Sequence, residues 1–568
     1  MPDRLVVPTP PPATPSRPLA IALTLVIALY AALTLYGLGT PDLESDEGRF
    51  GLSALNILSD SRHLAIVSQR PQGEPGSMPY MYPLALALSV TLLGATEFAL
   101  RIVNVAAVLA GGLLFRQAVG LLTGDTLLSF AAFAMFLLNA GTIVYARSAL
   151  PEAFVVAWGC VALFAALKAC QSPRAVWALL GGSALGVAFL AKLWLVVPFV
   201  LACASLVLAA NLRRDRPLPA HLIWLAAATF VGVSATHLLL VWSLAPDTWL
   251  HWREIYYQFT FKSRVAGAGY DPVMWHRPWW FYLAAAFKAS FFGLPFLILG
   301  LSRSLAARRS QTILVVGALL VPLLVFSLFR VKQASYVYST FPALALLMAL
   351  GLLDVLRRPD RNAWLAATAA SAALATVLFG VGVMPTVQWL GVLGLYLVYA
   401  GGAVLSRRQP AAVRFATVLA LGVAMLAPGL LVVHRALQHR TYYREIAAFF
   451  RPMLASASPR DPVFTAPESP AMEFYTFRHG AYWETFYYRE SLPAFQQALR
   501  ERRRLFYIVD PSGSLYGSSV SPEKLTALRE HTRDVTHLVA GALGHRLPLT
   551  VHTTAHAVPS LRPESYPR

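Results

Sequence analysis

The chain has 568 residues, of which 57% are hydrophobic and only 13% are charged. So few charges in a chain of this length exclude a water-soluble protein and indicate one that crosses a membrane many times. The formal net charge of +19 would suggest a nucleic-acid partner in a soluble protein, but most Lys and Arg lie in short loops between apolar runs, where they report membrane topology and a lipid environment.

The first predicted element is a transmembrane helix at 18–37. It follows a Pro-rich tail, residues 1–17, that we expect to be disordered and cytoplasmic. This tail lacks the small-residue cleavage pattern of a signal peptide, so the apolar run should remain in the protein as its first span.

The next stretch, residues 41–60, reads PDLESDEGRFGLSALNILSD. It places four carboxylates at the mouth of the first span: Asp42, Glu44, Asp46 and Glu47. Apolar residues then recur at helical spacing: Phe50, Ala54, Ile57 and Leu58. This pattern predicts a short amphipathic helix in the membrane interface, with acidic residues at its N-terminal end. The alternative is an ordinary helix start, at which Ser45 or Asp46 is the cap and Glu47 complements the helix dipole.

Further apolar runs follow. One, at 84–93, is too short to cross a bilayer and is interpreted as re-entrant or interfacial. The others are interpreted as spans, about thirteen in all with the first: 99–119, 126–145, 153–169, 177–190, 193–210, 221–242, 279–301, 312–329, 335–355, 363–383, 387–405 and 415–433. We therefore predict a polytopic α-helical membrane domain over residues 18–434.

Charge predicts the orientation of these spans. Alternate loops are rich in Arg: QSPR at 171–174, NLRRDRP at 211–217, LSRSLAARRS at 301–310, RRPDRN at 357–362 and SRRQ at 406–409. By the positive-inside rule these loops face the cytoplasm, and so does the N-terminus. An odd number of spans places the other loops and the C-terminal part on the outer face.

Residues 435–568 are polar in character. PVFTA and RLFYIVD indicate strands, and residues 493–502 indicate a helix. These signals predict a small extracytoplasmic α/β domain. The three cysteines, Cys160, Cys170 and Cys203, all lie in apolar runs, so neither a disulfide framework nor a thiolate zinc site is expected.

Several cationic residues lie at span ends or loops that the topology places outside: Arg101, Arg147, Lys192, Arg264, His276, Arg277, Arg330 and Lys332. Any one of them could simply snorkel or pair with a lipid headgroup. Collectively they predict a cationic pocket opposite the acidic pair Asp46 and Glu47. Such a pocket suits a phosphate-bearing ligand with a lipid tail, and the carboxylates could act as a general base or hold a cation.

These residues carry a resemblance. In order along the chain, six segments resemble motifs of the GT-C membrane glycosyltransferases, in particular the lipid A aminoarabinose transferases and their protein O-mannosyltransferase relatives: SDEGRF at 45–50, GATEFALR at 94–101, YARSALPEAF at 145–154, AKLW at 191–194, HRPWWFYL at 276–283 and VKQASYV at 331–337. The resemblance covers about residues 20–345 and rests on order, spacing and expected sidedness together.

The resemblance implies an inverting transfer of a sugar from a polyprenyl-phosphate donor, such as an undecaprenyl phosphate, to a lipid A-like lipid, glycan or protein at the outer face of a bacterial inner membrane. Asp46, Glu47 and Glu152 would be the catalytic acids. The residues implied to hold the donor phosphate are Lys192, Arg264, His276, Arg277 and Lys332. The further expected substrate-binding residues are Arg49, Tyr82, Arg147 and Tyr336. The scheme requires no metal, with a divalent cation at the acidic site left open.

The chain also departs from the family pattern. The family's acidic-Lys-Pro triplet is replaced by MYP at 81–83, with Tyr82 in place of the Lys, and the second acidic site is Glu152 instead of Asp. A Glu expected just before Arg264 is missing. A neutral sugar therefore fits the sequence as well as aminoarabinose does, and the acceptor is open.

Two other classes of function compete with a transferase. A transporter or flippase of an amphipathic anionic lipid would carry charges near the bilayer midplane and broken helices in two matching halves. The sequence instead concentrates charge at one face and has no visible two-fold repeat. A non-catalytic envelope assembly protein with an outer sensor domain is the third reading, in which the acidic stretch would have no chemical role.

Overall fold

The computed structural model describes residues 17–43, 46–59, 64, 80–212, 218–244, 246, 277–306, 310–330, 332–357, 360–380, 385–405, 410–438, 443–450, 464–465, 474–475, 492–500, 506–509, 522–543 and 550–553. These residues form two compact units. Unit 1 comprises Met1–Tyr36, Arg101–Leu240 and Arg253–Arg435, and unit 2 comprises Gly37–Leu100, Val241–Trp252 and Ala436–Arg568.

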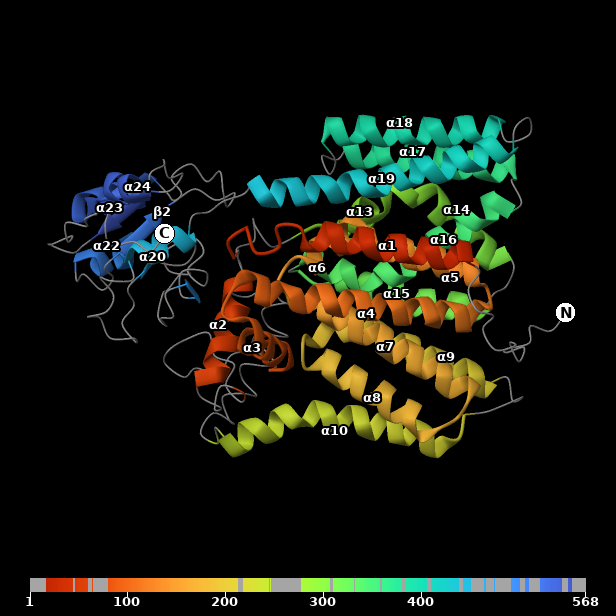
Figure 1. Cartoon of the computed structure of the whole chain (residues 1–568), viewed down its shortest axis with the longest axis horizontal. Helices are drawn as coiled ribbons and strands as arrows, with labels where there is room; N and C mark the ends of the chain where they lie inside the picture. The colour runs from red at the N-terminus through yellow and green to blue at the C-terminus, as the bar shows by residue number, and fades with distance from the viewer. Residues whose placement is uncertain are drawn as a thin grey trace. The chain divides into compact units, whose positions relative to one another are not determined.

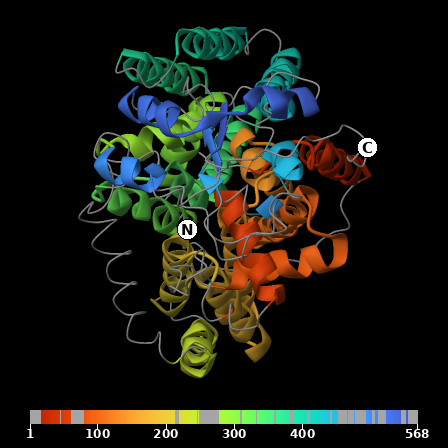
Figure 2. The same cartoon turned by 90° about the vertical axis from the view of Figure 1, so that its left-hand side faces the viewer.

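Unit 1 is helical and contains all or most of the long apolar helices, many of which run alongside one another (Figure 1). They are α1 (Arg17–Leu35), α4 (Glu97–Thr123), α5 (Thr126–Leu137), α6 (Ala140–Ala146), α7 (Pro151–Gln171), α8 (Ala175–Phe189), η2 (Leu193–Val196), α9 (Val197–Leu212), α10 (Ala220–Leu244), α13 (Phe281–Ser290), η5 (Phe291–Gly293), α14 (Leu294–Ala306), α15 (Ser310–Ser327), η6 (Ala334–Thr340), α16 (Phe341–Arg357), α17 (Arg361–Gly380), α18 (Thr386–Leu405) and α19 (Pro410–Gln438). Figure 2 gives the view turned by 90°, in which the yellow-green helix α10 is seen nearly along its axis.

Every predicted span coincides with one of these helices or with consecutive ones. In the part of the chain that the structure describes, ten helices are long and apolar enough to cross a membrane, and α5 with α6, bent by 60°, could form one more. Helix α8 is apolar but shorter, with 15 residues. A multi-pass membrane protein is therefore confirmed, while the count of thirteen spans stays a prediction.

The core of unit 1 is built on α16, which packs on α5 and α14. Helices α14 and α16 meet at two glycines. A Cβ atom on Gly300 would lie 2.0 Å from the Leu347 carbonyl oxygen, and one on Gly351 would lie 1.8 Å from that of Phe296. Small residues allow helix backbones to approach this closely. These two glycines therefore fix how near α14 comes to α16.

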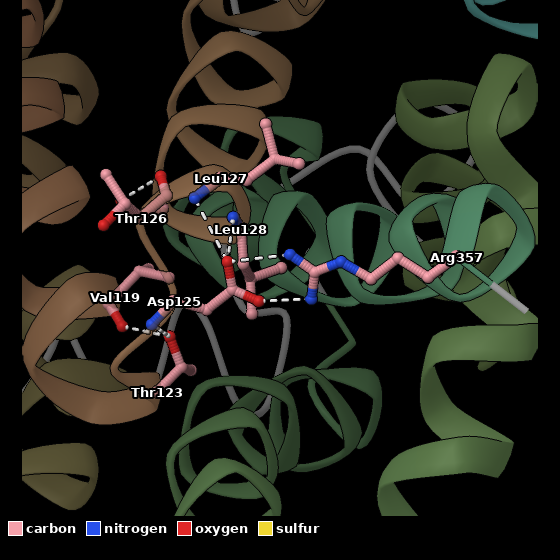
Figure 3. Close-up of polar contacts among 8 residues, drawn as sticks. Val119, Thr123, Asp125, Thr126, Leu127, Leu128 and Arg357 are labelled. Carbon is pink, nitrogen blue, oxygen red and sulfur yellow. Dashed lines mark hydrogen bonds and ion pairs between the residues drawn. The ribbon is translucent and has the colours of Figure 1, made fainter. Parts of the chain in front are cut away.

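Asp125 connects the start of α5 to the end of α16 (Figure 3). Its carboxylate accepts hydrogen bonds from the amides of Leu127 and Leu128, at 3.1 and 3.0 Å, and so caps the helix. The same carboxylate receives both terminal nitrogens of Arg357. Two-point pairing of this kind fixes geometry as well as charge.

Unit 2 contains two helices from the early part of the chain, α2 (Asp46–Ser59) and α3 (Met81–Leu93), which pack on each other. The predicted amphipathic helix is thus present, while its place in the membrane interface stays a prediction. Helix α3 has 13 residues, in agreement with the expectation that its run does not span. Of the four apolar residues at helical spacing, Phe50, Ala54 and Ile57 are buried and Leu58 is half exposed.

The later part of unit 2 is an α/β arrangement. Its strands are β1 (Phe464–Thr465), β2 (Phe506–Val509), β3 (Arg533–Asp534) and β4 (Thr550–Thr553), in the sheet order β1-β2-β4-β3. Strand β1 is parallel to β2, and the other pairs are antiparallel. The helices are α20 (Tyr443–Phe450), α22 (Leu492–Arg500), α23 (Pro522–His531) and α24 (Thr536–Leu543). The strands predicted from PVFTA and RLFYIVD and the helix predicted at 493–502 are therefore confirmed, whereas the boundary of the α/β domain stays a prediction.

Candidate functional site

The first cluster of predicted site residues lies in unit 1, where α7 begins. Pro151 is the first residue of α7 and Glu152 lies in its first turn. A proline fits here because the first helical amides have no partner within the helix, and a carboxylate complements the positive end of the helix dipole. The Glu152 side chain is 4% exposed. A charge this deeply buried requires a partner.

Lys192 is that partner. It precedes η2, which follows α8, and its Nζ atom lies 2.5 Å from Oε1 of Glu152. The Lys192 side chain is 25% exposed, so solvent reaches it, whereas the Glu152 side chain is enclosed. The second oxygen of Glu152, Oε2, is buried and accepts no hydrogen bond from the described residues. The pair therefore presents one carboxylate oxygen with remaining acceptor capacity beside an ammonium group.

An aromatic cluster lies beside Lys192 and contacts it through Tyr336. Its Nζ atom lies 5.7 Å from the ring centroid of Tyr336, within the range of a cation–π contact. Tyr336 is in η6, is buried, and stacks on Tyr282 with an interplanar angle of 6°. Phe326 packs against both tyrosines. Elements η2, η6 and α7 contact one another in this region, so three separate parts of unit 1 position the cluster.

A cationic hollow lies on the segments that flank this aromatic cluster. Its volume is about 430 Å³, and its lining residues are Arg277, Trp279, Ser327, Leu328, Phe329, Arg330 and Lys332. The side chains of Arg277 and Arg330 are exposed. Lys332 is buried, and its ammonium donates hydrogen bonds to the carbonyl oxygens of Arg277, at 3.0 Å, and Phe329. Burial lowers the pKa of Lys332 from the ordinary lysine value. Two predicted phosphate-binding residues thus lie together in one hollow.

Arg147 has a different environment from the other predicted cations. Its Nη1 atom donates hydrogen bonds to the carbonyl oxygens of Leu33, Thr34 and Tyr36, at 3.0, 3.0 and 2.8 Å. These carbonyls belong to the C-terminal end of α1, where no further turn of helix supplies amide donors. The geometry therefore gives Arg147 a role in closing α1, and its predicted substrate contact stays a prediction.

The acidic helix α2 lies in unit 2 and forms the second cluster. Asp46 and Glu47 are its first two residues. Asp46 is 43% exposed on its side chain and pairs with Arg49 one turn later, at 3.2 Å, while Glu47 is buried. Tyr82 of α3 is fully buried, with its ring edge-on to Phe50 at 5.3 Å. Of the two predicted catalytic acids on α2, Asp46 is thus the accessible one.

Unit 2 also contains an ionic cluster that the sequence analysis did not identify as a site. Arg444 of α20 pairs with Asp42 and with Glu97, which is in the first turn of α4. Tyr475 accepts a hydrogen bond from the amide of Leu43, at 2.8 Å. In the sequence Asp42 is only one of four neighbouring carboxylates. Glu97 lies within GATEFALR, whereas Arg444 lies 11 residues after the last predicted span and no motif marks it.

Arg264, His276 and Glu44 lie outside the described residues, so their predicted roles stay predictions. In the described parts of the chain, no group of three or more His, Cys, Asp or Glu side chains is arranged to hold a metal ion.

No family model matches the chain. The undecaprenyl phosphate-alpha-4-amino-4-deoxy-L-arabinose arabinosyl transferase of Pseudomonas aeruginosa (strain UCBPP-PA14) is 31% identical over 284 residues, which are 48% of this chain and 49% of that protein. Arabinosyl transferase 1 of the same kind, from Sodalis glossinidius (strain morsitans), is 30% identical over 350 residues, which are 56% of this chain and 59% of that protein. The chain thus matches about half the length of these relatives, and the resemblance to aminoarabinose transferases is confirmed at that level.

Solved structures confirm the fold. The crystal structure of ArnT from Cupriavidus metallidurans bound to undecaprenyl phosphate superposes with a TM-score of 0.64 over 94% of this chain and 98% of that chain, at 16% identity. The apo structure of the same protein gives a TM-score of 0.62 at 17% identity. The expected polytopic helical fold is therefore present, and it is the fold of ArnT.

Proposed function

We propose that the protein is an inverting glycosyltransferase of the bacterial inner membrane, which moves a sugar from a polyprenyl-phosphate donor to an acceptor on the outer face. The observation that carries this proposal is the hollow that gathers Arg277, Arg330 and Lys332 beside an aromatic cluster. It occurs in a fold whose solved representative, ArnT, is bound to undecaprenyl phosphate.

The chemistry follows from the bonds that change. An acceptor oxygen attacks the anomeric carbon of the sugar from the face opposite the phosphate, and the bond from that carbon to the phosphate oxygen breaks. The polyprenyl phosphate leaves with the electron pair and gains negative charge. Fixed cations that stabilise this developing charge contribute more than any other single factor. We assign that role to Arg277, Lys332 and Lys192, together with Arg264 and His276.

The proton of the acceptor goes to a carboxylate. We propose that Asp46, Glu47 and Glu152 supply this general base and orient the acceptor, with Arg49, Tyr82, Arg147 and Tyr336 as further substrate-binding residues. A general base must come within hydrogen-bond reach of the proton that it takes. Among the described residues no group donates a hydrogen bond to Oε2 of Glu152, so this oxygen has capacity to accept one.

The donor sugar and the acceptor are proposed only as classes. The names of the relatives specify 4-amino-4-deoxy-L-arabinose as the sugar. A lipid A-like lipid, a glycan or a protein each offers the hydroxyl or phosphate oxygen that the reaction needs. We propose that no metal takes part, so chelation with EDTA should leave turnover intact. A loss that Mg²⁺ or Mn²⁺ restores would instead place a divalent cation at the acidic residues.

The test has a cellular and a purified arm. Mass spectrometry of envelope lipids and glycans from cells with and without the protein should reveal one sugar modification that disappears with it. The purified protein should then transfer that sugar from its undecaprenyl-phosphate donor. The Asp46→Asn and Glu47→Gln variants should insert normally and lose transfer. Full transfer by both variants, or identical envelope composition in the two strains, would refute the proposal.

A further inference from the structure

We propose that Arg444 and Tyr475, which follow the last span, are positioning residues that hold the acidic first loop and helix α2 in their working arrangement. The inference rests on the proposed transferase function and extends it to a part of the chain to which no role has been assigned. All of its contacts lie within unit 2.

Arg444 joins three points that are far from it in sequence. Its Nη2 atom pairs with Oε1 of Glu97 and donates a hydrogen bond to the carbonyl oxygen of Gly39, at 3.1 Å. Its Nε atom lies 3.7 Å from Oδ1 of Asp42. The two carboxylates are buried, whereas Arg444 is 45% exposed on its side chain. A single guanidinium thus neutralises two desolvated acids and fixes the backbone of the loop between α1 and α2.

Tyr475 completes the cluster. Its hydroxyl accepts from the Leu43 amide, three residues before α2 begins, and also hydrogen-bonds with Glu97. Burial, together with the negative charges of Asp42 and Glu97, raises the pKa of Tyr475 well above that of an ordinary phenol. The hydroxyl therefore stays protonated and can donate to the carboxylate while it accepts from the amide.

The residue before it, Phe474, extends the clamp to α2 itself. A Cβ atom on Gly51 of α2 would lie 2.9 Å from the Phe474 ring and 2.8 Å from a Leu100 side-chain carbon. Gly51 is thus a point where the helix that begins with Asp46 and Glu47 lies directly against the later part of the chain. One face of α2 and the loop that leads into it are thus held by Arg444, Phe474 and Tyr475.

This arrangement has a functional consequence because Asp46 and Glu47 are the first two residues of α2. A shift of the loop at Leu43 moves the start of the helix, and with it the two carboxylates. Misplacement of a catalytic group by about 1 Å can cost about 100-fold in rate. Loss of the clamp should therefore lower turnover more than it changes donor affinity.

The experiment compares Arg444→Gln, Arg444→Lys and Tyr475→Phe with the wild type and with Arg500→Gln. Arg500 is a matched control because it is an exposed arginine of unit 2 whose hydrogen bond, among the described residues, goes to the Gln496 carbonyl in its own helix. We expect Arg444→Gln to lower kcat by about 10- to 100-fold while the KM for the undecaprenyl-phosphate donor stays within about two-fold. Arg444→Lys should recover part of the loss because it restores the charge, and Arg500→Gln should match the wild type.

A second measurement does not depend on activity. Hydrogen–deuterium exchange of the purified protein should show faster exchange over residues 37–59 in Arg444→Gln. In Tyr475→Phe the faster exchange should centre on the Leu43 amide, because its acceptor is gone. Unchanged exchange over 37–59 with wild-type kcat, or exchange that rises equally throughout the protein, would overturn the inference. An inactive wild type would instead count against the proposed function and leave the exchange result as the test of the clamp.

Discussion

Replacement of Lys192 by methionine is the sharpest probe of the cluster in unit 1. Methionine keeps the apolar stem but leaves the Glu152 carboxylate, 4% exposed, without its cation. Removal of one partner from a fully buried pair costs about 3–5 kcal/mol. Because Lys192 itself is 25% exposed, solvent already screens part of the attraction. We therefore expect Lys192→Met to lower the free energy of unfolding by about 2 kcal/mol.

A double-mutant cycle separates this electrostatic cost from chemistry. Glu152→Gln removes the charge and keeps the shape, so the double variant contains no unpaired buried carboxylate. It should be more stable than Lys192→Met alone by about 1–2 kcal/mol, as measured by equilibrium unfolding in mixed micelles. Transfer activity should remain low in the double variant, since the proposed base is still absent. Stability losses that simply add would show that Lys192 does not neutralise Glu152, and the reasoning would fail.

Three further perturbations test other parts of the molecule. Burial lowers the pKa of Lys332, so its ammonium loses its proton at a lower pH than an ordinary lysine would. We therefore expect kcat/KM for the donor to fall as pH rises into the alkaline range. The Lys332→Arg variant stays charged and should move that fall to higher pH. Gly351→Ala would place a Cβ 1.8 Å from a carbonyl oxygen of α14. The free energy of unfolding should fall by more than the ordinary overpacking cost of about 1–3 kcal/mol. Gly394→Ala, with no atom within 4 Å of its Cβ, is the matched control and should unfold at the wild-type temperature or above. Asp125→Ala removes a helix cap and should lower stability by about 1 kcal/mol. Asp125→Ser restores a cap and should recover most of that stability in the same thermal-unfolding assay. The pair with Arg357 stays broken in both variants, but exposed ion pairs contribute little.

The helices of this fold could be predicted because lipid offers the backbone no hydrogen-bond partners. An apolar run of sufficient length must satisfy its backbone within itself, so it forms a helix whatever its neighbours are. The break between α5 and α6 shows where that rule ends. The sequence predicts one span over 126–145, whereas Asn139 caps a new helix there and the chain bends by 60°. A single Asn in an apolar run is not enough to predict a bend of this size.

The ionic cluster around Arg444 could not be predicted for a different reason. Its contacts join residues about 350 to 430 positions apart, such as Asp42 and Arg444, and no periodicity in the sequence links them. Asp42 appears in the sequence as one of four adjacent carboxylates with equal claims to chemistry. The structure distinguishes it from Asp46, because Asp42 is buried against a guanidinium and Asp46 is 43% exposed. Acids only four positions apart thus differ in environment, one buried against a cation and the other open to solvent.

The cations also differ in environment, and this difference bears on the proposed phosphate contacts. Arg147 donates hydrogen bonds to three main-chain carbonyls at the end of α1. The last carbonyls of any helix lack donors within the helix and need partners from elsewhere. The ammonium of Lys332 bonds to two carbonyls and yet borders the hollow, while Arg277 and Arg330 extend exposed side chains over it. Phosphate oxygens bind most tightly where several donors converge with little loss of their own hydration. We therefore expect Arg277 and Arg330 to make the first contact with the donor phosphate, while Lys332, which also bonds to the Arg277 carbonyl, adds its charge to theirs.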